Sequence, residues 1–407
     1  MVLTPAPSSQ AGTAPRIEQL DALRGLAVIG IAWMNVLVFA LPGQAYYNPL
    51  AWAPDATSVG PLDRLVWAVS FVFVEDKFRT LFAMLFGAGC LILLERAHER
   101  RWRAHVARMA VLFAIGLVHS VLLASNDVLR AYALAGLAVP LLAGLSPRAL
   151  YAVAVGLVAV HVGAGMVALG AAVVDHHLGR AGTDAALFAA RNFGSDPGAL
   201  AHTLEIGREN FVDRVERRFS DIPAQLVVVA ASLPLNLAAM ALGMGLWKHR
   251  LLAGEWRTFR LQRLAAVAAI LSLPALFALT AWTAATDFAP AVAGAASVVL
   301  SAPFDTALGF AYAALAMALF APGGAVKRRL AATGRLALTN YLMTSLIFAA
   351  LFASWGLGLF GTFGRAEAVA LSFVPIAAML AWSPPWLAQF GQGPFERLWR
   401  RAARAFG

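Results

Sequence analysis

The stretch LDALRGLAVIGIAWMNVLVF, residues 20–39, decides the fold class of this 407-residue chain. It contains no charged residue after Arg24, and about 20 helical residues, rising 1.5 Å each, cross the hydrocarbon core of a bilayer. Nine more apolar runs follow, at residues 66–94, 106–124, 129–145, 149–174, 224–247, 264–284, 292–320, 336–353 and 367–387. The sequence therefore predicts an all-α, polytopic membrane protein with about ten transmembrane helices.

Composition supports this fold class and excludes a soluble domain. Hydrophobic residues make up 60% and charged residues 13% of the chain, with a mean hydropathy of +0.71, whereas soluble domains are roughly 45–50% apolar and 25% charged. The net charge of +10 comes from basic residues that lie between the apolar runs. We therefore expect membrane lipids as partners and no nucleic acid.

The positive-inside rule orients the chain. Residues 62–94 are too long for one straight span and are divided by Glu75-Asp76-Lys77, so we count them as one crossing plus an interfacial helix. With the amino terminus inside, 21 of the 32 Lys and Arg residues fall in cytoplasmic segments and 9 in outer ones. Both termini are therefore predicted to be cytoplasmic.

The chain divides into three predicted parts. Residues 1–19 form a disordered or interfacial amino terminus, residues 20–390 a transmembrane bundle, and residues 391–407 a basic amphipathic cytoplasmic tail typical of docking on anionic lipid heads. Within the bundle, residues 175–223 form a periplasmic or interfacial insertion, in which residues 205–218 are expected to be a helix resting on the outer face.

Ionisable residues within the spans are the candidate functional residues, because a charge in hydrocarbon costs about 3 kcal/mol or more. His119 lies toward the outer end of the third span, eight residues before Asp127. A histidine oriented by a carboxylate can act as a general base. Eight helical residues extend over about 12 Å, so contact requires a chain break near Ser125-Asn126. A structural hydrogen bond is the alternative role for His119.

Other charged residues have structural alternatives. Asp21 and Arg24 share one helix face and are expected to form an anchoring ion pair. Among Glu75, Asp76, Lys77 and Arg79 most charges should neutralise one another, and Lys77 or Arg79, if left over, would line an anion site. Asp305, at mid-membrane, is either protonated and silent or lines a passage.

Three neutral side chains, Asn35, Tyr132 and Asn340, are the remaining ligand-binding candidates. Asn35 and Tyr132 are expected to reach a polar cavity in the outer half of the bundle together with Lys77, His119 and Asp127, and helix-to-helix hydrogen bonding is the alternative role for Asn35. Asn340 is expected one turn beyond the cytoplasmic interface. His176 and His177 are adjacent and cannot share a helix face, and no other metal-ligand spacing occurs. No metal is expected.

Five segments resemble the YeiB family of bacterial inner-membrane proteins, which is built around a domain of unknown function. They are LDALRGLAVIGIAWMNVLVF (20–39), KFRTLFAMLFGAG (77–89), GLVHSVLLASNDVLRAYALAG (116–136), GRLALTNYLMTSLI (334–347) and GPFERLWR (393–400). The resemblance implies a multi-pass protein of the bacterial inner (cytoplasmic) membrane. More distantly, the LDALRG opening resembles transmembrane acyltransferases of the heparan-alpha-glucosaminide N-acetyltransferase type.

The distant resemblance implies transfer of an acyl group from cytosolic acyl-CoA to an acceptor at or across the membrane. His119 would be the base or acyl carrier, Asp127 would orient it, and Asn35 and Lys77 would polarise the reacting groups. A transporter, or a membrane protein that binds a lipid or small molecule without covalent chemistry, is the alternative. A third reading is a structural or sensing component that self-associates as a homodimer through small-residue faces at Gly87, Gly89 and Gly243.

Overall fold

The computed structural model describes residues 18–54, 59–96, 101–320 and 324–406, and within these it is entirely helical. Most of the expected amino-terminal segment, residues 1–17, lies outside the described residues. The following helices are each long and apolar enough to cross a membrane: α1 (Glu18–Ala40), α5 (Arg101–Leu122), α8 (Pro147–His177), α12 (Ile222–Lys248), α13 (Thr258–Ala285), α15 (Ala302–Leu319) and α18 (Arg365–Phe390). The protein is therefore a multi-pass membrane protein.

Three interrupted segments account for the other expected spans. Helices α3 (Pro61–Phe73) and α4 (Lys77–Arg96) together form one long apolar segment that can cross the membrane. With this segment, the described part of the chain has eight such spans. Helices α16 (Ala325–Arg335) and α17 (Ala337–Phe352) are long and apolar enough to cross the membrane only when taken together, and the angle between them is 80°. The described residues therefore hold eight helices able to cross a membrane, or nine if the bent pair is one span. The remaining expected span, residues 129–145, forms the shorter apolar helix α6 (Val128–Leu137) followed by α7 (Val139–Leu142).

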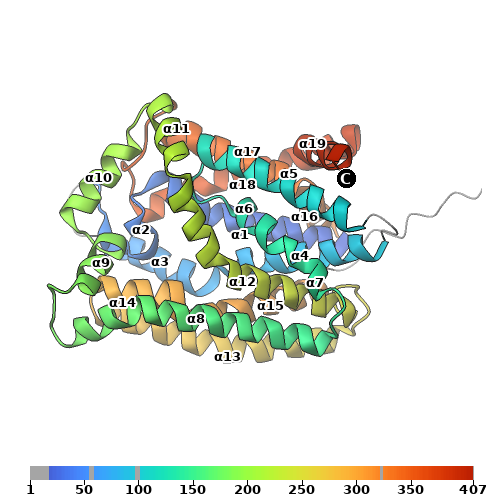
Figure 1. Cartoon of the computed structure of the whole chain (residues 1–407), viewed down its shortest axis with the longest axis horizontal. Helices are drawn as coiled ribbons and strands as arrows, with labels where there is room; N and C mark the ends of the chain where they lie inside the picture. Colours follow the sequence, from blue (N-terminus) through green and yellow to red (C-terminus); the bar gives the residue numbers. More distant parts are fainter. Residues whose placement is uncertain (1–17, 55–58, 97–100, 321–323, 407) are drawn as a thin grey trace, which may run out of the picture.

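Short helices gather at one end of the bundle, which we call the outer end after the side assigned by the charge pattern. Figure 1 shows α2 (Gln44–Tyr47), α9 (Asp184–Phe193) and α10 (Pro197–Gly207) at this end, and α19 (Pro394–Phe406) with the carboxyl terminus near the opposite, cytoplasmic end. The expectation of a single helix over residues 205–218 is wrong. The Asn210 side chain accepts a hydrogen bond from the Asp213 backbone N–H at 3.0 Å and begins a separate helix, α11 (Phe211–Ser220).

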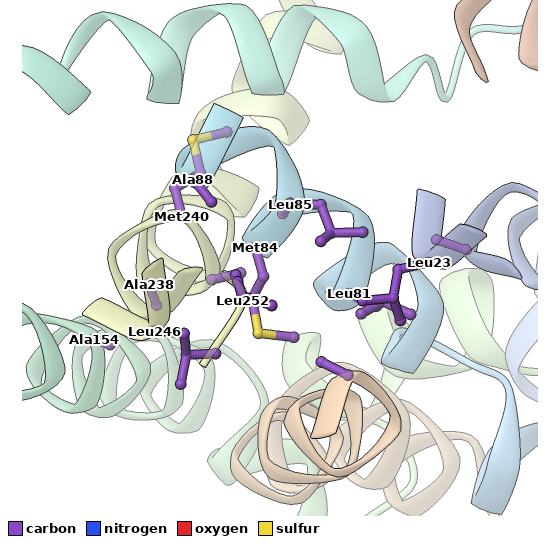
Figure 2. Packing of buried hydrophobic residues seen from close by; sticks show 14 of the residues in the cluster. Leu23, Leu81, Met84, Leu85, Ala88, Ala154, Ala238, Met240, Leu246 and Leu252 are labelled. Carbon is purple, nitrogen blue, oxygen red and sulfur yellow. The ribbon is translucent and has the colours of Figure 1, made fainter. Parts of the chain in front are cut away.

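Helices α4 and α12 pack closely against each other in the core of the bundle. Figure 2 shows Met84 and Ala88 of α4 beside Ala238 and Met240 of α12. A Cβ at Gly243 would lie 1.9 Å from the Met84 carbonyl oxygen, and one at Gly87 would lie 2.5 Å from the Met240 carbonyl oxygen. Gly87 and Gly243 therefore let two backbones touch within one chain, so the expectation that they form a face for self-association is wrong.

This contact makes Gly243 sensitive to the smallest substitution. We expect Gly243→Ala to destabilise the protein by about 1–3 kcal/mol, because the added methyl group forces the two backbones apart, and to lower the melting temperature in detergent. Gly156→Ala on α8 is the matched control, since a Cβ at Gly156 meets no atom within 4 Å. An equal melting temperature for Gly243→Ala and wild type would contradict the close α4–α12 contact.

The tail helix α19 is hydrogen-bonded to α17 and to α5. The Glu396 carboxylate accepts hydrogen bonds from the Thr339 backbone N–H at 3.1 Å and the Thr339 hydroxyl at 2.5 Å. Trp399 Nε1 donates to the Arg108 carbonyl oxygen of α5 at 2.9 Å. Because Leu336 supplies no side-chain cap to α17, Glu396 satisfies a backbone N–H that the helix start leaves without a partner.

Candidate functional site

The structure brings His119 and Asp127 into direct contact. Helix α5 ends at Leu122 and α6 begins at Val128, so the chain turns in the region where contact required a break. Asp127 caps α6 by accepting a hydrogen bond from the Arg130 backbone N–H at 3.1 Å. Its other carboxylate oxygen lies 2.7 Å from His119 Nδ1. The helix cap thus fixes the carboxylate that holds the imidazole.

The second ring nitrogen of His119 has no protein partner. Nε2 is buried and makes no hydrogen bond with any described residue, and the whole side chain is only 3% exposed. Because Asp127 accepts the proton carried by Nδ1, the neutral ring presents a lone pair at Nε2. A buried polar atom without a partner is costly, and here it is the atom that a general base uses.

A glycine makes room for this pair. A Cβ at Gly116, one helical turn before His119, would lie 2.5 Å from Asp127 Oδ1 and 2.9 Å from the Arg130 backbone nitrogen. Any larger residue at position 116 would therefore push α6 away from α5. The close approach of the two helices depends on this glycine.

Tyr341 and Arg130 complete the polar cluster, and neither was among the expected site residues. The Tyr341 hydroxyl donates to Asp127 Oδ2 at 3.3 Å, and its ring centroid lies 5.2 Å from that of His119. The Arg130 guanidinium is fully buried and donates to Gln225 Oε1 at 2.9 Å and to the Ser125 carbonyl oxygen at 2.7 Å. Its Nε lies 3.9 Å from Asp127 Oδ1, so Asp127 lies between a histidine and an arginine.

A second polar cluster contains the charges of the α3–α4 break. Lys77 Nζ lies 2.6 Å from Asp305 Oδ1 of α15, and both side chains are almost completely buried; Lys77 also donates to the Phe71 carbonyl oxygen. Arg79 donates to Asp76 at 2.7 Å and to Asn236 of α12 at 2.8 Å. Neither cation is left over, so the expectation that one of them lines an anion site is wrong. Asp305 is the buried partner of Lys77.

The neutral candidates Tyr132 and Asn340 both have hydrogen-bond partners within the protein. The Tyr132 hydroxyl donates to the Arg79 carbonyl oxygen at 3.0 Å, and the ring is stacked with those of Phe82 and Phe86. The Asn340 amide donates to the Thr333 carbonyl oxygen and the Ser383 hydroxyl and accepts from the Trp382 indole. Its donors and its oxygen therefore have protein partners, and its role is to join α16, α17 and α18.

The Asn35 side chain is half-buried. It lies one turn beyond Ile31 on α1, and Ile31 packs in the same apolar cluster as Tyr341 and Leu129. Since residues i and i+4 share a helix face, Asn35 is directed toward the side of α1 that faces Tyr341.

Asp21 and Arg24 form an ion pair at 2.9 Å at the start of the same helix.

Two pockets lie at the cytoplasmic end. One, of about 190 Å³, is lined by Arg335, Phe390, Gly391, Gln392, Glu396 and Arg400. The other, of about 490 Å³, is lined by Ala325, Arg328, Arg329, Leu380, Ala381, Pro384 and Pro385. Neither pocket is lined by His119, which lies deeper in the bundle. Among the described residues no group of three or more His, Cys, Asp or Glu side chains could hold a metal ion.

Comparison with known proteins identifies the family. The chain is 33% identical over 388 residues to the uncharacterized protein YeiB of Escherichia coli (strain K12), which covers 94% of each chain. The chain belongs to the YeiB family. This YeiB-family chain is also 28% identical over 406 residues to the uncharacterized protein YxaH of Bacillus subtilis (strain 168), covering 96% of the chain and 94% of YxaH.

A family model described as "Protein of unknown function (DUF418)" matches residues 246–405 of this YeiB-family chain. That region includes Tyr341 but neither His119 nor Asp127, so the site joins the two halves of the sequence. No solved structure matches the YeiB-family chain.

Proposed function

We propose that the protein is a membrane-embedded acyltransferase in which His119 is the general base. The observation that carries the proposal is a buried imidazole held by Asp127 through Nδ1 at 2.7 Å, with Nε2 left without a partner. A histidine that only joined helices would be expected to use both nitrogens. The distant resemblance to transmembrane acyltransferases supplies the reaction class.

The reaction follows from this arrangement. His119 Nε2 takes the proton of an acceptor hydroxyl or amine as that atom bonds to the thioester carbonyl carbon of the acyl donor. The carbon–sulfur bond then breaks, and the imidazolium returns the proton to the leaving sulfur, so charge and protons balance. Asp127 stabilises the imidazolium, and Tyr341 and the Arg130 backbone N–H hold Asp127 in place.

The donor we propose is acyl-CoA entering from the cytoplasmic end. The 190 Å³ pocket there presents Arg335 and Arg400, side chains suited to phosphate groups. An apolar cluster includes Tyr341, which lies beside His119, and has Phe395 and Trp399 of the tail region packed against it. Its other members are Ile31, Leu112, Leu129, Ala133, Leu338 and Leu342. An acyl chain is the part of the donor that such surroundings would accept.

The test is transfer of a labelled acyl group. Purified protein in lipid vesicles is incubated with acetyl-CoA carrying a radioactive acetyl group, and lipid-soluble and water-soluble products are separated. We expect a labelled product and release of free thiol that both depend on the protein. If neither exceeds the level in vesicles without protein, for acetyl-CoA and for longer acyl-CoA donors, the proposal fails.

The alternative, a transporter or binding protein without covalent chemistry, is favoured by one feature. The break between α3 and α4 and the π-helix η2 (Ala295–Leu300) before α15 flank the buried Lys77–Asp305 pair, and discontinuous helices around charges are typical of transport sites. Transport would expose this region to each side in turn. A Ser301→Cys variant in a Cys90→Ser background should then react with a membrane-impermeant thiol reagent added on either side, whereas lack of reaction from both sides would argue against transport.

A further inference from the structure

Buried side-chain atoms without hydrogen-bond partners occur both at the His119 site and on α11, which contacts α5. Among the described residues, nine buried side-chain nitrogen or oxygen atoms lack a hydrogen-bond partner. Four of them are His119 Nε2, Arg130 Nε, Arg214 Nε and Arg218 Nη1. Three of the four are thus guanidinium N–H groups, which can only donate.

Gln225 connects α11 to the His119 site. Its side-chain oxygen accepts a hydrogen bond from Arg130 Nη1 at 2.9 Å, and its side-chain nitrogen donates to the Arg218 carbonyl oxygen at 2.9 Å. Helix α11 also contacts α5, the helix that carries His119. The last turn of α11 therefore lies beside Arg130, at the outer end of the bundle (Figure 1).

Among the described residues, neither Arg214 nor Arg218 has a carboxylate of its own, and Glu209, which attracts both, is already paired with Arg217. Arg217 pairs with Glu209 at 2.8 Å and lies 3.4 Å from Asp221, so these acids have a cation of their own. Arg214 donates only to the carbonyl oxygens of Gly207 and Glu209. Burial, together with the neighbouring arginines, lowers the pKa of Arg218 to about 10. An anion placed here would relieve both the repulsion and the missing hydrogen bonds.

We propose that the acceptor of the acyl group carries a phosphate, which Arg218 and Arg214 bind on α11, beside the His119 site. The open donors belong to separate guanidinium groups, and a tetrahedral phosphate offers oxygens in several directions, whereas a carboxylate is best matched by the two-pronged fork of one arginine. That this ligand is the acyl acceptor rests on the proposed acyl transfer. The phosphate is that of a lipid headgroup or of a soluble phosphate ester.

Binding is tested without any acyl donor, so that its failure is separate from failure of acyl transfer. The melting temperature of the protein in detergent is measured with potassium phosphate against potassium chloride of equal ionic strength, and with phosphatidylglycerol added to the micelles. We expect phosphate or phosphatidylglycerol to raise the melting temperature of the wild type. The probe that acts identifies a soluble or a lipid source.

Arg218→Gln should need roughly tenfold more of the active probe for half of the shift, because one charged hydrogen-bond donor is lost. Without the probe its melting temperature should equal or exceed that of the wild type, since a desolvated cation has been removed, which also shows that the variant folds. Arg208→Gln, on the exposed end of α10, is the matched control and should respond as the wild type does. The proposal is overturned if neither probe shifts the wild type, or if Arg218→Gln responds equally.

Discussion

Replacing His119 by alanine is expected to lower the rate of acyl transfer by about 10²–10⁴-fold, the usual contribution of a general base. The expectation follows from the free Nε2, because no other described side chain offers a buried, unpartnered nitrogen that can accept a proton beside a carboxylate. The rate is measured with labelled acyl-CoA in lipid vesicles, per amount of folded protein.

Three controls separate chemistry from packing. Asp127→Asn keeps the shape of the carboxylate but removes its charge, so it should also lower the rate. His105→Ala removes another buried histidine of α5, whose Nε2 bonds to the Gly136 carbonyl oxygen, and should cost stability without a specific loss of rate. His202→Ala, on the surface of α10, should change neither. Unchanged transfer by folded His119→Ala protein would eliminate the general-base role.

Replacing Lys77 by methionine is expected to destabilise the protein by about 3–5 kcal/mol, since it leaves the Asp305 charge buried without a cation. Lys77 is fully buried and its ammonium lies 2.6 Å from Asp305. The double variant Lys77→Met with Asp305→Leu should recover most of this loss, because two apolar side chains can replace a buried ion pair at little cost.

The measurement is the free energy of unfolding in detergent for the two single variants and the double variant. Arg180→Met is the comparison, since Arg180 is 3.8 Å from Asp175 with 62% of its side chain exposed, and exposed pairs contribute about 0–1 kcal/mol. If the double variant were as unstable as Lys77→Met, the pair would be needed for something other than mutual neutralisation. The transport alternative would then gain support.

Much of the architecture could be predicted from apolar runs alone. Each of the ten runs corresponds to one helix or to a short series of consecutive helices, because bilayer thickness fixes the length of a span and lipid leaves the backbone no other way to satisfy its polar groups. The contact of His119 with Asp127 depended on a chain break at Ser125-Asn126, and a turn lies there. Local sequence carried this information because the two residues are only eight positions apart.

Partners that are distant in the sequence could not be predicted. Tyr341 reaches Asp127 across 214 positions, and Arg79 reaches Asn236 across 157. Hydropathy specifies which residues enter the membrane, but the side that each helix presents to its neighbours is set by packing of the whole bundle. For this reason Lys77, Arg79 and Asn340 were predicted as ligand-binding residues, whereas in the structure the side chain of each joins helices.

The hydrogen bonds from Thr339 to Glu396 have a consequence for biosynthesis. A nascent chain is released from the ribosome with its carboxyl end last, so α17 is inserted before the residue that completes its first turn has been made. The cap on the first turn of α17 can therefore form only after residue 396 has been made. Chains that terminate before this residue would enter the bilayer with all their spans and still lack the final locking step of assembly.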